Sequence, residues 1–366
     1  MQFIDLKSQY EFLQDKIDLR IKQVLNHGQY IMGPEVHELE SQLASYVDVK
    51  YAITCANGTD ALQLALMALG IGPGDAVFTT PFTFFATAEA ISFIGATPVF
   101  VDIDAKTYNI DYQQLDIAIN KVLSEGNLTV KAVIAVDLFG LPADYPSLTE
   151  VCSKYDLKLI EDAAQGFGGS IDHRKAGCFG DIATTSFFPA KPLGCYGDGG
   201  ALFTNDDRIA DLLRSYRVHG KGKDKYDNLR IGMNSRLDTI QAAVLLEKLA
   251  VFDSELALRQ KIADAYNAHL SDRLVIPFVP EKYQSSWAQY SLLAADCTQR
   301  QKWMDDLKAE GVPTMVYYSN PLHLQSAFAD LGYVQGDFPC SEDVAQRVFS
   351  LPMSPYIDHN LVLNAC

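Results

Sequence analysis

The amino-acid sequence predicts an α/β protein in which a mainly parallel sheet forms a large domain and a smaller domain follows. Strand-like and helix-like patterns alternate through the first two thirds of the 366 residues, as in a parallel sheet covered by helices. A composition of 48% hydrophobic and 21% charged residues is typical of globular chains with a sizeable core. We expect the large domain at residues 1–250 and the small domain at residues 251–366.

The first expected strand, Tyr51 to Ala56, leads into a helix that opens with Asn57-Gly58-Thr59-Asp60. Free N–H groups and the helix dipole make the amino terminus of a helix a ready phosphate site. We therefore expect Gly58 and Thr59 to donate to a phosphate. The alternative is an ordinary cap, because asparagine, threonine and aspartate also begin helices that bind nothing.

Three further strands are expected at residues 76–79, 97–101 and 132–136. Phe84 follows the first of them, in the stretch Pro81-Phe82-Thr83-Phe84-Phe85. Aromatic rings favour offset stacking on one another, so Phe84 is a candidate to cover the face of a heteroaromatic ligand. Packing in the core is the alternative.

The short apolar run from Leu157 to Ile160 predicts a buried strand, and Asp162 comes just after its carboxyl end. In open α/β sheets, ligands bind in the crevice outside those ends. Asp162 is thus placed to meet a ligand. Gln165, three residues later, is expected to reach the same ligand.

Lys191 follows another strand-like stretch, Ile182 to Phe188. Pro192 biases the backbone of Lys191 towards extended geometry, which favours a fixed and non-helical placement. Four glycines between residues 194 and 200 let the backbone pass close to a ligand. Ser186 is expected to add a hydroxyl group to the phosphate site.

A lysine and an aspartate in these places are what pyridoxal phosphate needs. A lysine holds this cofactor as a Schiff base, and a carboxylate opposite the pyridine nitrogen keeps that nitrogen protonated. Lys191 and Asp162 are therefore the candidate catalytic residues. Taken singly, each also fits a solvated charge in a loop, because charged side chains mostly lie outside.

The remaining elements lead into the small domain. Apolar spacing predicts a helix over residues 237–249, and a second helix from Leu256 to Leu270 carries the chain onwards. Small-domain elements are expected at 290–294, 301–310, 314–318 and 344–349. Tyr317, Tyr318 and His323 are candidates to border a substrate, with core aromatics and a surface histidine as the alternative. Because the chain stops soon after Leu361, we expect a truncated carboxyl end.

The charge distribution limits the partners. A formal net charge of -16 argues against nucleic acid. A local cluster of basic residues still suits an anionic substrate such as a nucleotide diphosphate, although a solvated helix and loop is the alternative. The cluster consists of Arg208, Arg214, Arg217, Lys221, Lys223, Lys225, Arg230 and Arg236. Within it, residues 219–223 are expected to form a mobile substrate loop.

Cysteine and hydropathy patterns indicate a cytoplasmic protein. Seven cysteines without a Cys-x-x-Cys pair fit reduced thiols better than a disulfide framework. The seven histidines lack the spacing of metal ligands, so no metal site is expected. No run is long enough to span a bilayer, and the amino terminus does not resemble a signal peptide, so no membrane partner is expected.

With these residues in place, the chain resembles the nucleotide-sugar aminotransferases of the DegT/StrS type, which have the aspartate aminotransferase type I fold with a smaller C-terminal α+β domain. The resemblance runs from Phe3 to Tyr356. Its most specific segments are Gly28 to Val36, Asn57 to Leu62, Glu161 to Gln165, Ser186 to Gly200 and Gly232 to Asp238.

The resemblance implies a role for each matching residue. Lys191 would hold pyridoxal phosphate and move the proton, Asp162 would pair with the ring nitrogen, and Gln165 would lie near the ring hydroxyl. Gly58, Thr59 and Ser186 would hold the phosphate. Asn234 would reach the phosphate of the neighbouring subunit, so the active unit would be a homodimer with shared sites. Tyr30 and His219 would contact the substrate.

Within this family the segment from Ser186 to Gly200 is most similar to enzymes that aminate the 3-keto position of a UDP-linked N-acetylglucosaminuronic acid. The implied amino donor is L-glutamate, and the implied role is surface polysaccharide biosynthesis. Arg236 would meet a carboxylate of sugar or glutamate through a bidentate contact, with an exposed salt bridge as the alternative. Members that dehydrate sugars replace the lysine with histidine, so Lys191 favours amino transfer. A dehydratase or epimerase and a non-catalytic regulatory protein that binds the same cofactor are the rival functions.

Overall fold

A seven-stranded sheet is the centre of the computed structural model, which describes residues 1–224 and 226–366. Lys225, a member of the expected basic cluster, lies outside the described residues. The strand order is β1-β9-β8-β5-β4-β2-β3, and β3, β2, β4, β5 and β8 run parallel. The strands are β1 (Tyr51–Cys55), β2 (Asp75–Thr79), β3 (Thr97–Phe100), β4 (Thr129–Val136), β5 (Lys158–Asp162), β8 (Ile182–Ser186) and β9 (Gly200–Thr204). The predicted mainly parallel α/β fold is confirmed.

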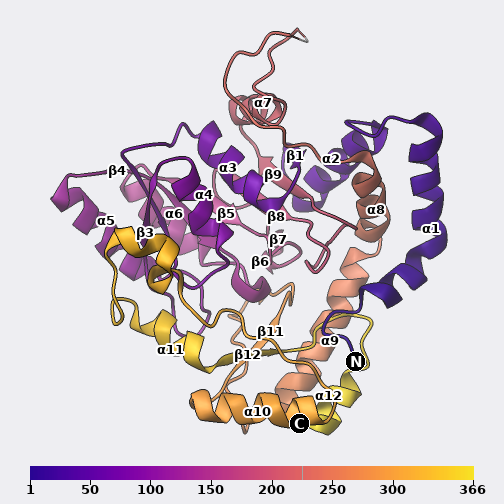
Figure 1. Cartoon of the computed structure of the whole chain (residues 1–366), viewed down its shortest axis with the longest axis vertical. Helices are drawn as coiled ribbons and strands as arrows, with labels where there is room; N and C mark the ends of the chain where they lie inside the picture. The colour runs from indigo at the N-terminus through magenta and orange to yellow at the C-terminus, as the bar shows by residue number, and fades with distance from the viewer. Residues whose placement is uncertain (225) are drawn as a thin grey trace.

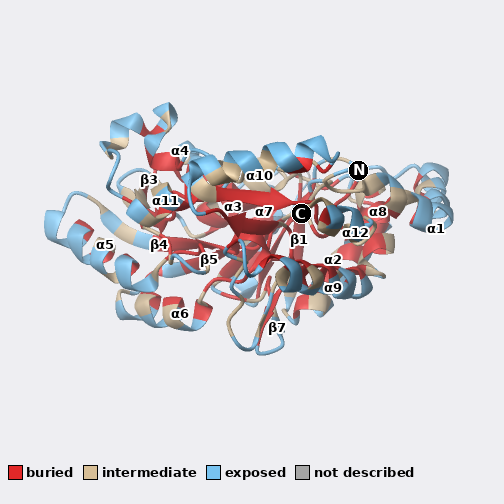
Figure 2. Ribbon diagram, turned by 90° about the horizontal axis from the view of Figure 1, so that it is seen from below, coloured by how far each residue is buried: buried red, intermediate tan, exposed pale blue. Residues whose placement is uncertain are grey.

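Helices cover both faces of this sheet, because its strands carry apolar side chains on both sides (Figures 1 and 2). Ile53, Ile160 and Leu202 pack beneath α3, α4 and α7 on one face. Phe78 and Leu159 face α5 and α6 on the other, where α2 and α8 cover the β1 side. The helices are α2 (Pro34–Val47), α3 (Gly58–Ala68), α4 (Ala86–Phe93), α5 (Tyr112–Glu125), α6 (Tyr145–Lys154), α7 (Asp207–Tyr216) and α8 (Thr239–Leu249).

Helix α1 (Leu6–His27) lies along α8 at the side of the molecule (Figure 1). Leu13 and Ile17 pack against Val244 of α8. Helix α8 is therefore covered by α1 and α2, and it reaches the sheet as a buried element.

The carboxyl-terminal part begins with α9 (Phe252–Leu270) and has its own core around Tyr266, Tyr290 and Phe349. Strands β11 (Tyr290–Leu293) and β12 (Val348–Leu351) pair antiparallel. In the expected element at 314–318, Met315 makes an isolated bridge to Ser350 and no regular strand or helix forms. The other elements are α10 (Cys297–Ala309), α11 (Pro339–Arg347), α12 (His359–Ala365), the 3-10 turns η1 (Leu138–Gly140), η2 (Leu322–Leu324) and η3 (Ser326–Leu331), and the short strands β6 (Ser170–Ile171), β7 (Arg174–Lys175) and β10 (Tyr283–Gln284).

The described residues contain neither a membrane-spanning helix nor a cluster of metal-ligating side chains. None of their helices combines the length and the apolar character that crossing a membrane requires. Nor do three or more histidine, cysteine, aspartate or glutamate side chains gather in them as a metal site would need.

Candidate active site

Asp162 is the last residue of β5 and lies at the carboxyl edge of the parallel strands. It is 5% exposed. Its Oδ2 accepts a hydrogen bond from Thr87 Oγ1 of α4 at 3.0 Å, and its Oδ1 accepts from the Ala164 N–H at 3.2 Å. Burial raises the pKa of Asp162, while the Ala164 N–H, the charge of Lys191 and Thr87 work in the other direction. The carboxyl group is thus held in one orientation in a place with little water.

Lys191 lies in the turn after β8, where its N–H donates to Phe188 O at 2.8 Å. Its side chain is partly buried. Burial lowers the pKa of Lys191, and the charge of Asp162 opposes that shift. Because each group contributes to the pKa of the other, the two side chains lie in one electrostatic environment. The structure therefore brings together the two residues that the sequence selected separately.

The start of α3 lies beside the end of β8. Asn57 caps the helix by accepting from the Asp60 N–H at 2.8 Å, and the first bond within the helix runs from Ala61 N to Asn57 O at 3.1 Å. The N–H groups of Gly58 and Thr59 come before that bond and stay available to an anion. A Cβ on Gly58 would stand 2.7 Å from Ser186 Cβ, so glycine is required for this close approach. Asn57 can therefore cap the helix while the N–H groups of Gly58 and Thr59 remain free to bind a phosphate.

Phe84 and Gln165 are both neighbours of Tyr318. Phe84 is 55% exposed, so packing in the core, its alternative role, is wrong. Gln165 is buried, with Oε1 accepting from the Phe139 N–H at 2.8 Å and Nε2 donating to Tyr318 Oη at 3.4 Å. The Tyr318 ring lies 6.3 Å from the ring of Phe84. Tyr318 thus contacts two residues that the sequence assigns to the cofactor, and burial raises its pKa above the usual value for tyrosine.

The other expected substrate residues are more dispersed. Tyr30 is 48% exposed, in the turn before α2, and its carbonyl accepts from the Thr239 N–H at 2.9 Å. His219 is exposed in the loop after α7. Tyr317 packs at 6.3 Å from the ring of Phe3. Their contacts with a substrate stay predictions.

His323 is 2% exposed, so the alternative of a surface histidine is wrong. Its Nε2 lies 3.0 Å from Glu342 Oε1, and its ring packs on Phe338 at 4.7 Å. Both partners follow later in the chain, and together they enclose the ring. Within one chain, His323 therefore shows almost no surface to a sugar.

Asn234 and Arg236 lie just before α8. Asn234 is exposed, and its Oδ1 accepts from Arg236 Nη2. Arg236 forms no ion pair with a described residue, so the alternative of a structural salt bridge is wrong. Its buried Nε also has no hydrogen-bond partner in the described part of the chain. The guanidinium therefore keeps capacity for a carboxylate from outside this chain.

The expected basic cluster is only partly a surface patch. Arg217 is 4% exposed, and its Nη1 donates to Glu40 Oε1 at 2.5 Å and to Thr54 O at 2.7 Å. Its assignment to a substrate patch is wrong, since this guanidinium joins α2 to β1. Arg230 is also engaged, donating to Ser215 Oγ at 2.6 Å.

Thr87 was not selected from the sequence, yet it donates directly to Asp162 and is 1% exposed. The sequence marks Thr87 only by its place in the chain. It follows Phe84 by three residues, on the first turn of the helix after a strand whose carboxyl end faces the site. Threonine is too common in such turns for this signal to have sufficed.

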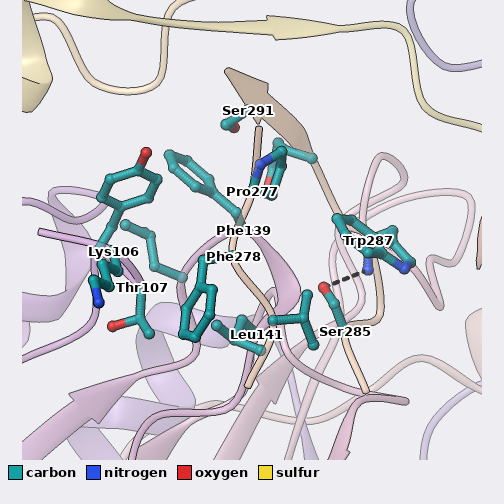
Figure 3. Close-up of a pocket in the computed structure, with 13 residues that line it drawn as sticks. Lys106, Thr107, Phe139, Leu141, Pro277, Phe278, Ser285, Trp287 and Ser291 are labelled. Atoms are coloured by element: carbon teal, nitrogen blue, oxygen red, sulfur yellow. Dashed lines mark hydrogen bonds between the residues drawn. The ribbon is translucent and has the colours of Figure 1, made fainter. Parts of the chain in front are cut away.

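A small cavity lies next to Phe139, the residue whose N–H binds Gln165 (Figure 3). It has a volume of about 20 Å³ and is lined by Lys106, Phe139, Phe278, Trp287 and Gln289, among others. That volume holds about one water molecule. The cavity is thus too small for a sugar or a pyridine ring and is not the active site.

Comparisons with known proteins agree with this geometry. The DegT/DnrJ/EryC1/StrS aminotransferase family matches residues 12–364. The UDP-2-acetamido-2-deoxy-3-oxo-D-glucuronate aminotransferase of Pseudomonas aeruginosa is 49% identical over 359 residues, which are 98% of this chain and 96% of that protein. A pleiotropic regulatory protein of Geobacillus stearothermophilus is 43% identical over 356 residues, 96% of this chain and 93% of that one.

Among solved structures, a DegT DnrJ EryC1 StrS aminotransferase from Brucella abortus has a TM-score of 0.97 and 50% identity, and the match covers 100% of this chain and 98% of that chain. The expected resemblance and the expected class of enzyme are confirmed. The chain belongs to the DegT/DnrJ/EryC1/StrS aminotransferase family.

Proposed function

We propose that this aminotransferase moves an amino group from L-glutamate to a UDP-linked 3-keto N-acetylglucosaminuronic acid, for surface polysaccharide biosynthesis. The convergence of Lys191 and Asp162 at the carboxyl edge of the sheet is the observation that carries the reaction. The 49% identity to the Pseudomonas aeruginosa enzyme supports the sugar. Seven free cysteines, three of them buried, suit the reducing cytoplasm in which we place the enzyme.

The described residues fit pyridoxal phosphate, the cofactor of this family. The start of α3, with Gly58, Thr59 and Ser186, offers a phosphate cradle that a larger residue at position 58 would fill. Asp162 is buried with both oxygens held, as a partner of a pyridine nitrogen should be. Phe84 presents an exposed ring to cover one face. When bound, the cofactor supplies an electron sink for carbanion chemistry.

Lys191 would move the proton in both halves of the reaction. A lysine acts as a base only if its pKa comes down towards the working pH. Burial at this site lowers the pKa of Lys191 in that direction. The Asp162 carboxylate would hold the proton on the ring nitrogen, and Gln165, fixed by the Phe139 N–H, would orient the ring hydroxyl.

We further propose a homodimer in which each subunit completes the other's site. The loop that follows α7, here called the arm, comprises residues 218–224 and 226–233 and projects from the body above α7 (Figure 1). It exposes large apolar side chains, since Ile231 is 90% and Leu229 61% exposed. Exposed apolar residues on a projecting segment are typical of protein contacts. Asn234, at the base of the arm, would then reach the neighbouring phosphate.

The substrate contacts follow from that arrangement. Arg236 would bind a carboxylate of the sugar or of glutamate in a bidentate contact, because its guanidinium has no acid partner among the described residues. Tyr318, beside Gln165, and Tyr317 would border the sugar, as would Tyr30 and His219. His323 is the weakest member of this set, since it is enclosed by Glu342 and Phe338.

A panel of UDP- and dTDP-linked keto sugars, assayed with glutamate, tests the substrate. We expect the UDP-linked 3-keto uronic acid to give the highest kcat/KM. Equal turnover of sugars without a carboxylate would contradict the uronic acid assignment. The visible absorbance of the bound cofactor should vanish in Lys191→Ala, and wild-type protein that shows no such absorbance after incubation with pyridoxal phosphate would contradict the cofactor role of Lys191.

A non-catalytic regulator is the second candidate, favoured by the 43% identity to a protein described as regulatory. It predicts bound cofactor whose visible absorbance does not respond to glutamate. A transaminase instead loses that absorbance when glutamate is added alone, because the amino group stays on the cofactor. A dehydratase or epimerase would likewise not respond to glutamate, so one titration separates the proposed function from both rivals.

A further inference from the structure

The turn that carries Lys191 is held by helix α8. We call residues 187–199 the lysine loop. The loop closes on itself, since the Cys195 N–H donates to Phe187 O at 2.8 Å. From outside, Gln241 of α8 accepts from the Tyr196 N–H at 2.8 Å. The position of the lysine loop therefore depends on its contacts with α8.

Lys248, two turns further along α8, makes the second of these contacts. Its side chain is 1% exposed, and its Nζ donates to Gly194 O at 2.7 Å. Nζ also lies 4.2 Å from the centroid of the Tyr196 ring. No described carboxylate forms an ion pair with it. A buried ammonium group is costly unless it is well partnered, and both partners here belong to the lysine loop.

Helix α8 also reaches the other parts of the site. The Thr239 N–H at its start donates to Tyr30 O at 2.9 Å, and Thr239 Oγ1 accepts from the Gly33 N–H at 3.1 Å. Just before the helix, Ser235 Oγ accepts from the Ala56 N–H at 3.1 Å, beside the start of α3. One rigid helix thus sets the lysine loop, the phosphate cradle and the Tyr30 turn relative to one another.

We propose that Lys248 is a positioning residue for Lys191: by holding Gly194 O it fixes the lysine loop against α8 and so keeps Lys191 Nζ opposite Asp162. The inference rests on the proposed role of Lys191 as the residue that holds the cofactor. Lys248 itself touches neither cofactor nor substrate. Its contribution is geometric, and small displacements of a reacting group are costly to a rate.

Lys248→Met tests this, since it keeps most of the stem and removes the donor and the charge. In the holoenzyme we expect kcat to fall about 10- to 100-fold, with each KM changed by less than about threefold. We also expect the pH midpoint of the bound cofactor's visible absorbance to move. The matched control is Arg259→Met, because Arg259 is 4% exposed and donates to Trp287 O at 2.9 Å and Met353 O at 3.2 Å, away from the lysine loop.

The control should lose thermal stability and keep both kcat and the pH midpoint. A Lys248→Met enzyme with the wild-type kcat and midpoint, or one that loses only stability as the control does, overturns the inference. If Lys248→Met does not fold, Lys248→Gln is measured instead, because its shorter side chain also withdraws the donor from Gly194. A moved midpoint in that variant supports the inference and an unmoved one overturns it. Failure of the proposed function looks different, since wild-type protein would then show no cofactor absorbance.

Discussion

Asp162 is held by one side chain, one backbone N–H and one opposing charge. Thr87 fixes Oδ2, Ala164 fixes Oδ1, and Lys191 lowers the cost of the negative charge. These contacts matter because burial raises the pKa of this carboxyl group. The balance between burial and partners decides whether Asp162 is ionised when it meets a ring nitrogen.

Thr87→Val should disturb that balance without changing the shape of the site. Valine keeps the volume of threonine and removes a hydrogen bond to a charged acceptor, worth about 1.5–3 kcal/mol. We expect the pKa of Asp162 to rise and kcat to fall about tenfold or more, measured in steady-state kinetics across pH. Thr185→Val is the control, because Thr185 is also 1% exposed but donates to a carbonyl, Ala163 O at 3.1 Å. A similar loss of kcat in both variants would contradict a specific role of Thr87.

Lys248 should give the stability of the protein a pH dependence of its own. Burial lowers its pKa to about 8 from the ordinary 10.5. Between these values the unfolded chain binds the proton and the folded chain does not, so unfolding becomes less favourable as pH rises. The free energy of unfolding, measured with denaturant, should gain about 2–3 kcal/mol between pH 8 and 10.5 relative to Lys248→Met. If the free energies of unfolding of the two proteins differ by the same amount throughout this pH window, the lowered pKa of Lys248 is contradicted.

Single residues differ in how far the sequence reveals them. Asp162 and Lys191 were found because each follows a strand, and the carboxyl ends of parallel strands meet at one edge. Arg217 was misassigned because its partner, Glu40, lies 177 residues earlier in the chain. The burial of His323 could not be read from the sequence for the same kind of reason, since its ring is enclosed by Glu342 and Phe338. Contacts between distant segments leave no local signal.

At the scale of elements, α3 joins fold to chemistry. Its apolar residues pack beneath the sheet, and its start presents two N–H groups beside Ser186. The helix dipole adds to the attraction for a dianion placed there. The same buried packing that stabilises α3 therefore also fixes the direction of the phosphate site.

Gly58→Ala should separate the two roles of this element. The added Cβ would stand 2.7 Å from Ser186 Cβ, so helix and strand must move apart. We expect pyridoxal phosphate to bind about 10- to 100-fold more weakly, measured by titration of the visible absorbance. The reason is that the N–H groups at the start of α3 and the Ser186 hydroxyl group would no longer point at the same phosphate. Gly72→Ala is the control, since a Cβ at Gly72 meets nothing closer than Ile94 O at 3.9 Å. Equal affinity in the two variants would argue against the cradle.

Elements with continuous apolar runs could be predicted from the sequence. An amphipathic helix with few buried side chains could not. Strands β2, β3, β4 and β5 agree with the expected ranges to within a few residues, because β2, β4 and β5 are largely buried on both faces and β3 is buried on one. Helix α1 was missed, since only Gln9, Leu13, Ile17 and Val24 are buried among its 22 residues. Its buried side chains pack against α8, so their spacing can be recognised only when the position of α8 is known.

At the scale of the whole molecule, the chain brings Lys191 and Asp162 into one electrostatic environment and exposes apolar surfaces that the second subunit of the proposed dimer would cover. Phe12 and Leu19 of α1 are 67% and 60% exposed, and the arm adds Ile231. Asn234 follows the arm directly in the chain and is itself exposed. The proposed dimer therefore accounts for the exposed apolar side chains and for the exposed Asn234 together.

Mixed dimers test the shared site. Lys191→Ala lacks the catalytic lysine, and Asn234→Asp places a negative charge against the neighbouring phosphate, so each variant alone should be inactive. Subunits of the two mixed at random should recover about a quarter of wild-type activity, because half of the dimers contain one complete site. Lys191→Ala mixed with Asp162→Asn is the control, since both changes fall within one subunit's share of the site. Activity no higher than in that control would contradict sharing through Asn234.

The arm is joined to the body of the protein through backbone contacts. Its base is latched by backbone bonds, from His219 N to Met233 O at 2.8 Å and from Leu229 N to Gly220 O at 2.9 Å. Gly220, with φ at +69°, lies so close to Arg230 O that no side chain fits there. The described residues beyond this latch, 221–224 and 226–228, belong to no strand of the sheet. Because these bonds join backbone atoms, we expect the tip of the arm to accept other side chains while the body of the protein keeps its fold.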